Sequence, residues 1–321
     1  MHPFDNTAAT TGDDNTLRFW DLENLTMTKS VPLTQIGGDK NKKPKKRNRR
    51  QGKRGGVATT GKHKPENCSR ALSFCNVGEN IAVGMNDGSF LVLRESDLSK
   101  VCQKKNPRRQ QWIQDLKYSP LDDVLAVSTH DNFIDLWSYD AGAEDGNYAH
   151  FGQCDGHRSF VTHLDWSACG RYLQTNCGAY ELLFWDTKDV EEGGQRKVKR
   201  MGRGGSELCD TEWSTQNCVI AFACTGIWYC PEGYTLNCVD KSKAGDLLAV
   251  GEDSSLIKLY KYPCVGTFVK SGRDPMLGGA QGNAAIGHGS HVSNLKFSFD
   301  DSRVVSVGGD DNATMVWKVV R

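Results

Sequence analysis

Residues 56–63, GVATTGKH, follow the spacing of a phosphate-binding loop, in which a glycine-rich turn ends in a lysine and a hydroxyl side chain. The hydroxyl would bind the metal ion of a nucleotide, but His63 stands at that position. Such a loop also needs an apolar strand before it and a helix after it. No apolar strand leads into Gly56, and Pro65 follows where the helix should begin. The sequence therefore predicts no nucleotide site.

Histidine and cysteine are the other residue types that could hold a metal ion or act as a nucleophile. The twelve cysteines contain no CxxC pair, and neither a His-x-x-x-His pair nor a nucleophile elbow is present. The N-terminus has no secretory apolar block, so the cysteines are predicted to be reduced and mostly buried thiols of a cytosolic protein. His157, His163, His288 and His291 lie in or beside repeat starts, where a structural use is expected. We predict no catalytic residue, no metal ion, no cofactor and no enzymatic activity.

Electrostatics offers a stronger functional signal than nucleophiles do. Residues 40–64 contain twelve Lys or Arg and no acidic residue, and the rest of the chain contains 28 basic and 39 acidic residues, a net charge of −11. Like-charge repulsion with Pro44 and several glycines predicts a segment that is disordered when free. The predicted electrostatic arm consists of Lys42, Lys43, Lys45, Lys46, Arg47, Arg49, Arg50, Lys53 and Arg54.

Three hypotheses for this arm stay open: an acidic protein or nucleic acid as partner, a nuclear-import signal, and a solvated loop without a dedicated partner. No aromatic residue occurs in residues 37–66, which removes base stacking and makes nucleic acid unlikely as a partner. A second basic stretch, residues 195–205, follows acidic residues and is predicted to be a solvated loop between strands.

The sequence contains a repeated pattern that predicts the elements in which the residues discussed above lie. An Asp lies six residues before a large apolar residue at five places: Asp14/Trp20, Asp87/Leu93, Asp131/Trp137, Asp253/Leu259 and Asp311/Trp317. Most of these Asp residues precede Asn or Gly, which tolerate positive φ and close tight β-hairpins between the short apolar strands on each side. A sixth copy at 172–185 keeps both strands but has Ala179 in place of the Asp.

Units of roughly 40–60 residues with three or four strands and no competing helical period are typical of a β-propeller. Seven units are predicted, centred near residues 15, 85, 130, 175, 220, 250 and 308, and the unit at 206–230 is degenerate. The first and last blades are predicted to be incomplete and to be neighbours in a closed ring. Residues 36–66 form the basic insertion between blades 1 and 2. A solenoid is the alternative architecture.

The pairs Gly156–His157 and Gly287–His288, together with FWDL at 19–22 and FWDT at 184–187, resemble the WD-repeat family. In that family a histidine, a strand hydroxyl, the hairpin Asp and a Trp form a structural hydrogen-bonded network. The resemblance assigns these positions in the last unit to His288, Ser306, Asp311 and Trp317.

Longer phrases resemble the second propeller of the echinoderm microtubule-associated protein-like (EMAP-like) family, among them RALSFCNVGENIAVGMNDGSF (70–90) and GHGSHVSNLKFSFDDSRVVSVGGDDNATMVWK (287–318). The resemblance implies that residues 1–321 are one propeller of a longer tandem-propeller protein. It also implies a non-enzymatic scaffold that binds tubulin or microtubules, in the cytoplasm or in a cilium, with the arm contacting acidic tubulin tails. A general WD-repeat adaptor without tubulin binding and an RNA-associated scaffold are the alternatives. No membrane partner is expected.

Overall fold

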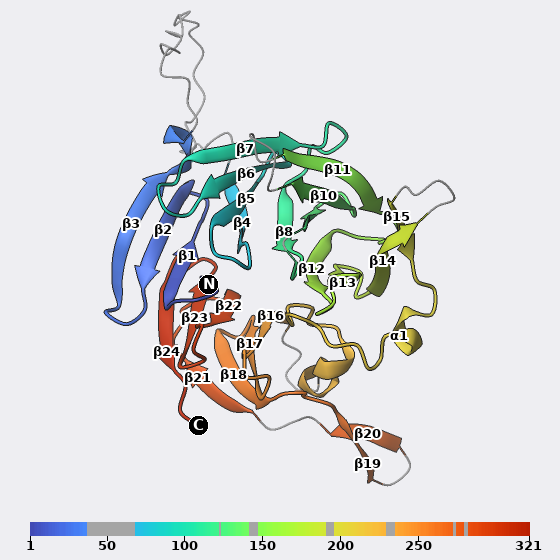
Figure 1. The fold of residues 1–321 in the computed structure, drawn as a ribbon. Coiled ribbons are helices and arrows are strands. Elements are labelled where there is room, and N and C mark those ends of the chain that lie inside the picture. Colours follow the sequence, from blue (N-terminus) through green and yellow to red (C-terminus); the bar gives the residue numbers. More distant parts are fainter. Residues whose placement is uncertain are drawn as a thin grey trace, which may run out of the picture.

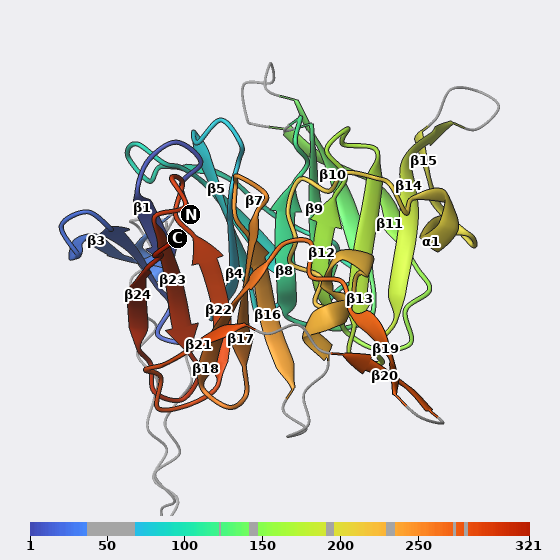
Figure 2. The ribbon, with the colours of Figure 1, turned by 90° about the horizontal axis from the view of Figure 1, so that it is seen from below.

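The computed structural model describes residues 1–36, 68–121, 123–140, 147–190, 196–228, 235–271, 274–278 and 282–321. Within these residues, six antiparallel sheets stand around a common axis, as seen along that axis in Figure 1 and from the side in Figure 2. No helix among the described residues has the length and apolar content that a membrane span requires.

The first three sheets follow one another along the chain. The first contains β1 (Thr7–Thr10), β2 (Thr16–Asp21) and β3 (Thr26–Pro32). The second contains β4 (Ser69–Phe74), β5 (Asn80–Met85), β6 (Ser89–Arg94) and β7 (Lys100–Lys105). The third contains β8 (Ile113–Tyr118), β9 (Val124–Thr129), β10 (Ile134–Asp140) and β11 (Asn147–Cys154). A short 3-10 turn, η1 (Leu33–Gln35), follows β3.

The other three sheets complete the ring. The fourth contains β12 (Val161–Trp166), β13 (Tyr172–Cys177), β14 (Leu182–Val190) and β15 (Arg196–Arg200). The fifth contains β16 (Leu236–Lys241), β17 (Leu247–Glu252), β18 (Leu256–Lys261) and β21 (Asn283–Ile286). The sixth contains β22 (Val292–Phe297), β23 (Arg303–Gly308) and β24 (Thr314–Lys318). A separate hairpin, β19 (Thr267–Ser271) and β20 (Asp274–Gly278), lies at the outer edge of the ring (Figure 1).

Each strand's composition matches its distance from the axis. The second strands are packed on both faces by neighbouring sheets, and all six residues of β5 and of β9 are buried. A strand buried on both faces reads as a continuous apolar run. The outermost strand β7, by contrast, exposes Lys100, Gln103 and Lys105 to solvent. The innermost strands, such as β8, alternate buried apolar residues with polar residues near the axis.

The predicted tight hairpins are present. Asn15, Asn132 and Asn312 have φ values of 57°, 75° and 53°, and Gly88 has a φ of 83°. In the fifth sheet the residue with positive φ is Ser255, two residues after the hairpin Asp. These left-handed residues reverse the chain between β1 and β2 in the first sheet and between the second and third strands in the other four sheets.

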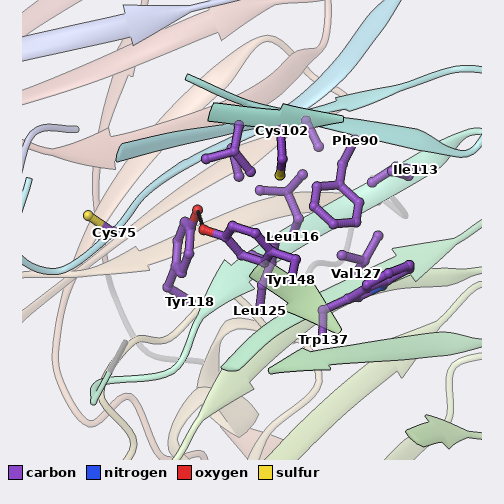
Figure 3. Packing of buried hydrophobic residues seen from close by; sticks show 13 residues of the cluster. Cys75, Phe90, Cys102, Ile113, Leu116, Tyr118, Leu125, Val127, Trp137 and Tyr148 are labelled. Atoms are coloured by element: carbon purple, nitrogen blue, oxygen red, sulfur yellow. Dashed lines mark hydrogen bonds between the residues drawn. The ribbon is translucent and has the colours of Figure 1, made fainter. Parts of the chain in front are cut away.

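Apolar clusters join each sheet to its neighbour. Figure 3 shows the cluster between the second and third sheets, where the rings of Phe90 and Trp137 are 5.1 Å apart and the hydroxyls of Tyr118 and Tyr148 are 2.8 Å apart. Between the last and first sheets, Val305 packs with Ala8 and Leu22. The ring is therefore closed, which excludes the solenoid and makes the first and last sheets neighbours, each with three described strands as predicted.

The prediction of about seven blades is wrong, because the described residues form six blades. Residues 201–228, which include the degenerate unit, contain the four-residue helix α1 (Gly204–Glu207) and the 3-10 helix η2 (Phe222–Trp228) instead of a sheet. This segment occupies the space between the fourth and fifth sheets, where Val219, Cys224 and Ile227 pack against the fifth. Its polar residues 214–217, STQN, break the apolar alternation that a blade strand needs.

Candidate functional site

The last blade brings four side chains together through hydrogen bonds. His288 places Nε2 2.7 Å from the Ser306 hydroxyl and Nδ1 2.8 Å from an Asp311 carboxylate oxygen. The Trp317 indole donates to the same hydroxyl over 2.8 Å. Asp311 also accepts hydrogen bonds from the backbone amides of Ala313 and Gly289. The hydrogen bonds from these two amides and the contact with His288 lower the pKa of the Asp311 carboxyl. The arrangement ties the hairpin to the loop before the innermost strand.

The fourth blade builds a related network from a different acid. His157 contacts the Thr175 hydroxyl over 2.7 Å, and the Trp185 indole donates to that hydroxyl over 2.9 Å. Ala179 cannot supply a carboxylate, but Glu181 lies two residues later and accepts a bond from the backbone amide of Arg158. Its Oε2 is 3.6 Å from His157 Nδ1. Burial lowers the pKa of His157 to about 4, so its imidazole is neutral at neutral pH.

Charged residues occupy the fifth position of the four innermost strands β8, β12, β16 and β22. We call this set the axial ring: Lys117, Asp165, Asp240 and Lys296. Lys296 lies 2.7 Å from Asp240, and the other Asp240 oxygen accepts the backbone amide of Phe297 over 2.8 Å. Burial alone would lower the pKa of Lys117, but the neighbouring Asp115 raises it above its usual value. The axial ring has balanced charge, and its Asp240–Lys296 pair links β16 to β22.

Asp165 is the most densely bonded member of the axial ring. It is fully buried and accepts bonds from the Thr215 hydroxyl at 2.6 Å and from the backbone amides of Asn217 and Cys218 at 2.8 Å. Burial alone would raise the pKa of its carboxyl, but these hydrogen bonds keep that pKa below its usual value. Asp165 thus anchors the irregular segment that stands in for a blade.

Aromatic and cationic side chains form a row on the hairpin face of the ring. The Arg70 guanidinium lies 4.7 Å from the Trp112 ring centre, Trp112 lies 4.6 Å from His130, and His130 stacks on Phe160 at 4.3 Å. We call these four residues the aromatic row. The backbone amides of His130 and Gly178 donate to the carbonyls of Trp112 and Phe160, so the row rests on the hairpins. It crosses from the second to the fourth sheet and gives this face rigid, partly exposed contact area.

The sequence-predicted site residues are placed unevenly. The nine residues of the predicted arm lie outside the described residues. His163 lies on β12, where burial lowers its pKa, and His291 lies directly before β22.

Residues 196–200 of the second basic stretch form strand β15 rather than the predicted loop. In this strand Lys197 and Lys199 are in register with Asp189 and Asp186 of β14. Of the eleven described cysteines, only Cys169 and Cys209 are exposed.

A model of the echinoderm microtubule-associated protein second β-propeller matches residues 1–319. The chain belongs to this family. Human echinoderm microtubule-associated protein-like 3 is 31% identical over 322 residues, which cover 99% of this chain and 30% of that protein. The 77 kDa echinoderm microtubule-associated protein of Lytechinus variegatus is 35% identical over 79% of this chain and 35% of its own length. The ciliary WD repeat-containing protein ctxp80 of Euplotoides octocarinatus is 31% identical over 97% of this chain and 38% of its own length.

Solved structures agree on the architecture of this EMAP family member. A chain in the crystal structure of the mitotic checkpoint complex aligns over 99% of this chain and 86% of its own, with a TM-score of 0.62 and 11% identity. The WD40 repeats of RRP9 align over 100% and 93%, with a TM-score of 0.57 and 12% identity. At these identities the likeness shows the WD40-type propeller fold.

Sequence reasoning about this family member missed three acidic residues: Glu181, Asp165 and Asp240. A sequence signal exists for the last two, since both lie at the fifth position of an inner strand, where Lys117 and Lys296 also lie. Glu181 gave no such signal, because the hairpin repeat places the acid two residues earlier.

Proposed function

We propose that this chain is a non-enzymatic propeller scaffold that binds tubulin or microtubules. The observation that carries the proposal is the family match over residues 1–319, with relatives whose names describe microtubule-associated proteins. The chain spans between 30% and 38% of the length of the three relatives described above, so the activity of those whole proteins is extended to this chain only as a proposal. One of those relatives is named as ciliary, and we extend the proposed location to microtubules of the cytoplasm or of a cilium.

Rigid display of loops is the mechanism that we infer. Apolar clusters join neighbouring sheets, and the His288 and His157 networks hold two hairpins against the loops before the inner strands. The His288 network is fully paired, and a fully paired buried network fixes one arrangement of its members. Surface loops held in this way present a preorganised contact area, which lowers the entropy lost on binding. In both networks the histidine serves the packing of the blade, which supports a scaffold over an enzyme.

The predicted arm supplies long-range attraction in this proposal. Its nine Lys and Arg residues lie in a chain whose remaining charge is negative, so the attraction for an acidic tubulin tail is concentrated in one segment. Attraction between exposed charges falls as salt shortens the screening length, from about 10 Å at 0.1 M to about 3 Å at 1 M. Binding through the arm is therefore expected to weaken steeply with salt.

Microtubule co-pelleting over a salt series tests the proposal. The chain is compared with a variant in which the nine arm residues are replaced by Gln, and with a charge-conserving scramble of the same residues. We expect the wild type and the scramble to pellet at low salt and the Gln variant to pellet markedly less. Lys197→Gln with Lys199→Gln is the control for loss of positive charge elsewhere and should pellet like the wild type, because these strand positions pair with acidic residues.

Two outcomes would contradict the proposal in different ways. Equal pelleting of the wild type and the Gln variant at low salt would remove the arm's role and leave the family-based proposal standing. Absence of pelleting by every folded form at low salt would overturn tubulin binding by this chain.

A general protein-interaction adaptor is the second candidate, and the aromatic row favours it. Aromatic and arginine side chains supply much of the binding energy at protein interfaces. An affinity purification in which non-cytoskeletal proteins dominate, and in which Trp112→Ala loses them, would favour the adaptor over the microtubule-binding function.

A further inference from the structure

Three ligand-type side chains converge in the fourth blade. His157 precedes β12, Cys177 ends β13, and Glu181 lies in the hairpin that leads to β14. The Cys177 thiol donates to Glu181 Oε2 over 3.3 Å, and the same oxygen is 3.6 Å from His157 Nδ1. One ligand atom from each residue lies within 4.8 Å of the others. We call these residues the blade-4 cluster.

The protonation of the His157 ring follows from the hydroxyl beside it. Thr175 has one hydroxyl proton, which it donates to the Leu183 carbonyl over 3.4 Å. When this bond is made, the Trp185 indole at 2.9 Å and His157 Nε2 at 2.7 Å both donate to the hydroxyl oxygen. In this tautomer Nε2 carries the ring proton, and Nδ1 has a lone pair that can bind a metal ion.

This lone pair points toward a second acceptor. The His157 side chain is 0% exposed, and Nδ1 has no hydrogen-bond partner within the part of the chain that the structure describes. Its nearest polar neighbour is the Glu181 carboxylate, which cannot donate when ionised. The Glu181 carboxylate also accepts from the Arg158 amide and the Cys177 thiol. A metal ion between the Nδ1 lone pair and the carboxylate would satisfy both acceptors.

The last blade provides an internal comparison. There His288 Nδ1 lies 2.8 Å from Asp311, a normal hydrogen bond, whereas the matching distance in blade 4 is 3.6 Å. The last residue of the second strand is Gly308 in that blade and Cys177 in blade 4. In the last blade the histidine and the carboxylate are therefore directly hydrogen-bonded. In blade 4 they are too far apart for a hydrogen bond, and the Cys177 thiol lies beside them.

We propose that His157, Cys177 and Glu181 bind a divalent transition-metal ion, with zinc as the best fit. An imidazole nitrogen, a thiolate and a carboxylate oxygen form a zinc-type ligand set. Metal–ligand bonds of about 2.0–2.3 Å at tetrahedral angles separate ligand atoms by about 3.3–3.8 Å, which matches the two distances to Glu181. The Thr175 hydroxyl holds the ring by its other nitrogen, as outer partners of metal-bound histidines do.

Binding has a defined proton balance and an open coordination position. Zinc replaces the Cys177 thiol proton, so one proton is released to solvent for each ion bound. Glu181 is 21% exposed at its side chain, which allows a water molecule to serve as the fourth ligand. The Arg158 guanidinium contacts the other carboxylate oxygen at 3.3 Å and is itself 86% exposed, so it does not close the site.

Cobalt substitution tests the proposal on the folded chain. Titration with Co²⁺ should give tetrahedral d–d bands and a thiolate-to-cobalt charge-transfer band, and one equivalent of Zn²⁺ should remove both. Cys177→Ser should lose the charge-transfer band and weaken zinc binding by about tenfold or more. Cys169→Ser, which removes an exposed thiol of the same blade, is the matched control and should bind like the wild type.

Cys177→Ser changes a buried residue and could disturb folding. Glu181→Gln is therefore a second test, because the Glu181 side chain is partly exposed and does not fill the core. With wild-type circular dichroism, this variant should also bind cobalt more weakly and lose the zinc-induced rise in melting temperature. Absence of a charge-transfer band in the wild type would overturn the proposal. An unchanged band in Cys177→Ser, or its loss in Cys169→Ser, would also overturn it.

Discussion

Indole-to-hydroxyl hydrogen bonds recur in three blades. Trp20, Trp185 and Trp317 each donate from Nε1 to a hydroxyl of the preceding strand, over 2.8, 2.9 and 2.8 Å respectively. In the fourth and sixth blades the same hydroxyl also contacts a histidine. One small side chain therefore bonds to two polar rings, and removing it leaves one nitrogen of each ring without that hydroxyl.

Ser306→Ala should reduce the free energy of unfolding by about 1–3 kcal/mol, because the Trp317 indole N–H and the buried Nε2 of His288 both lose their hydroxyl partner. Chemical denaturation followed by tryptophan fluorescence measures the change. Ser293→Ala removes an exposed hydroxyl from the same blade and should stay within about 0.5 kcal/mol of the wild type. Equal stability of the two variants would show that the network does not support the blade.

At the scale of elements, tight hairpins and one irregular segment define the blades. The hairpins depend on a residue that adopts positive φ, such as Asn312. The segment at 213–220 depends on long-range bonds, since its backbone donates to the side chain of Asp165 on β12. A mutation would therefore destabilise a hairpin by straining its turn, and it would destabilise the irregular segment by removing the buried carboxylate that anchors it.

Asn312→Val should destabilise the protein by about 1–2 kcal/mol, because a β-branched residue resists the left-handed conformation at φ 53°. Asn312→Gly removes the same side-chain hydrogen bond without this strain and serves as the matched control. Thermal unfolding of both variants measures the difference. A valine variant as stable as the glycine variant would contradict the role of the turn conformation.

Asp165→Asn should cost about 3 kcal/mol, since bonds to a buried carboxylate are stronger than bonds to an amide. Hydrogen exchange at the amides of Asn217 and Cys218 should become faster, because both donate to Asp165. Asp155→Asn, at an exposed position, is the control. Wild-type protection of both amides in the Asp165 variant would show that the segment is held by other contacts.

Acid should weaken the same anchor. The folded pKa of Asp165 lies below its unfolded value, so the unfolded chain binds more protons in the window between the two pKa values. The contribution of Asp165 is therefore complete above about pH 4 and is lost as the pH falls through the folded pKa. Unfolding free energies measured from neutral to acidic pH should decline less steeply in Asp165→Asn than in the wild type. Parallel curves would contradict this assignment.

At the scale of the whole molecule, ring closure couples the two ends of the described chain. Ala8 and Leu22 of the first blade pack against Val305 of the last, and Asn6 donates to Asp300 over 3.2 Å. Contacts between residues nearly 300 positions apart cost loop-closure entropy but remove the exposed sides of two sheets. Stability of the first blade therefore depends on the last.

Leu22→Ala should cost about 2–5 kcal/mol, because it leaves a cavity at the junction between the two blades. Hydrogen exchange should become faster in β23 as well as in β1 and β2. Leu25→Ala, three residues away at a side chain that is 65% exposed, should change little. Normal protection of β23 in Leu22→Ala would show that the two blades are not coupled.

The sequence by itself determined the features that depend on near neighbours. Positive-φ residues after the hairpin Asp, apolar runs in doubly buried strands, and the family phrases all predicted a propeller and the residues of its last network. These features need only residues that are within about 30 positions of one another.

The tertiary structure decided the rest, because it depends on partners that are distant in sequence. Six blades form instead of seven since Asp165 holds residues 215–218, about 50 positions away, in an irregular path between two sheets. Glu181 replaces the missing hairpin acid only because the fold of β13 and β14 brings its side chain back to His157 and Cys177. The repeat pattern shows which residue types recur at each position. Where a copy departs from the pattern, as at Ala179, only the packing of the strands shows which other side chain takes the missing role.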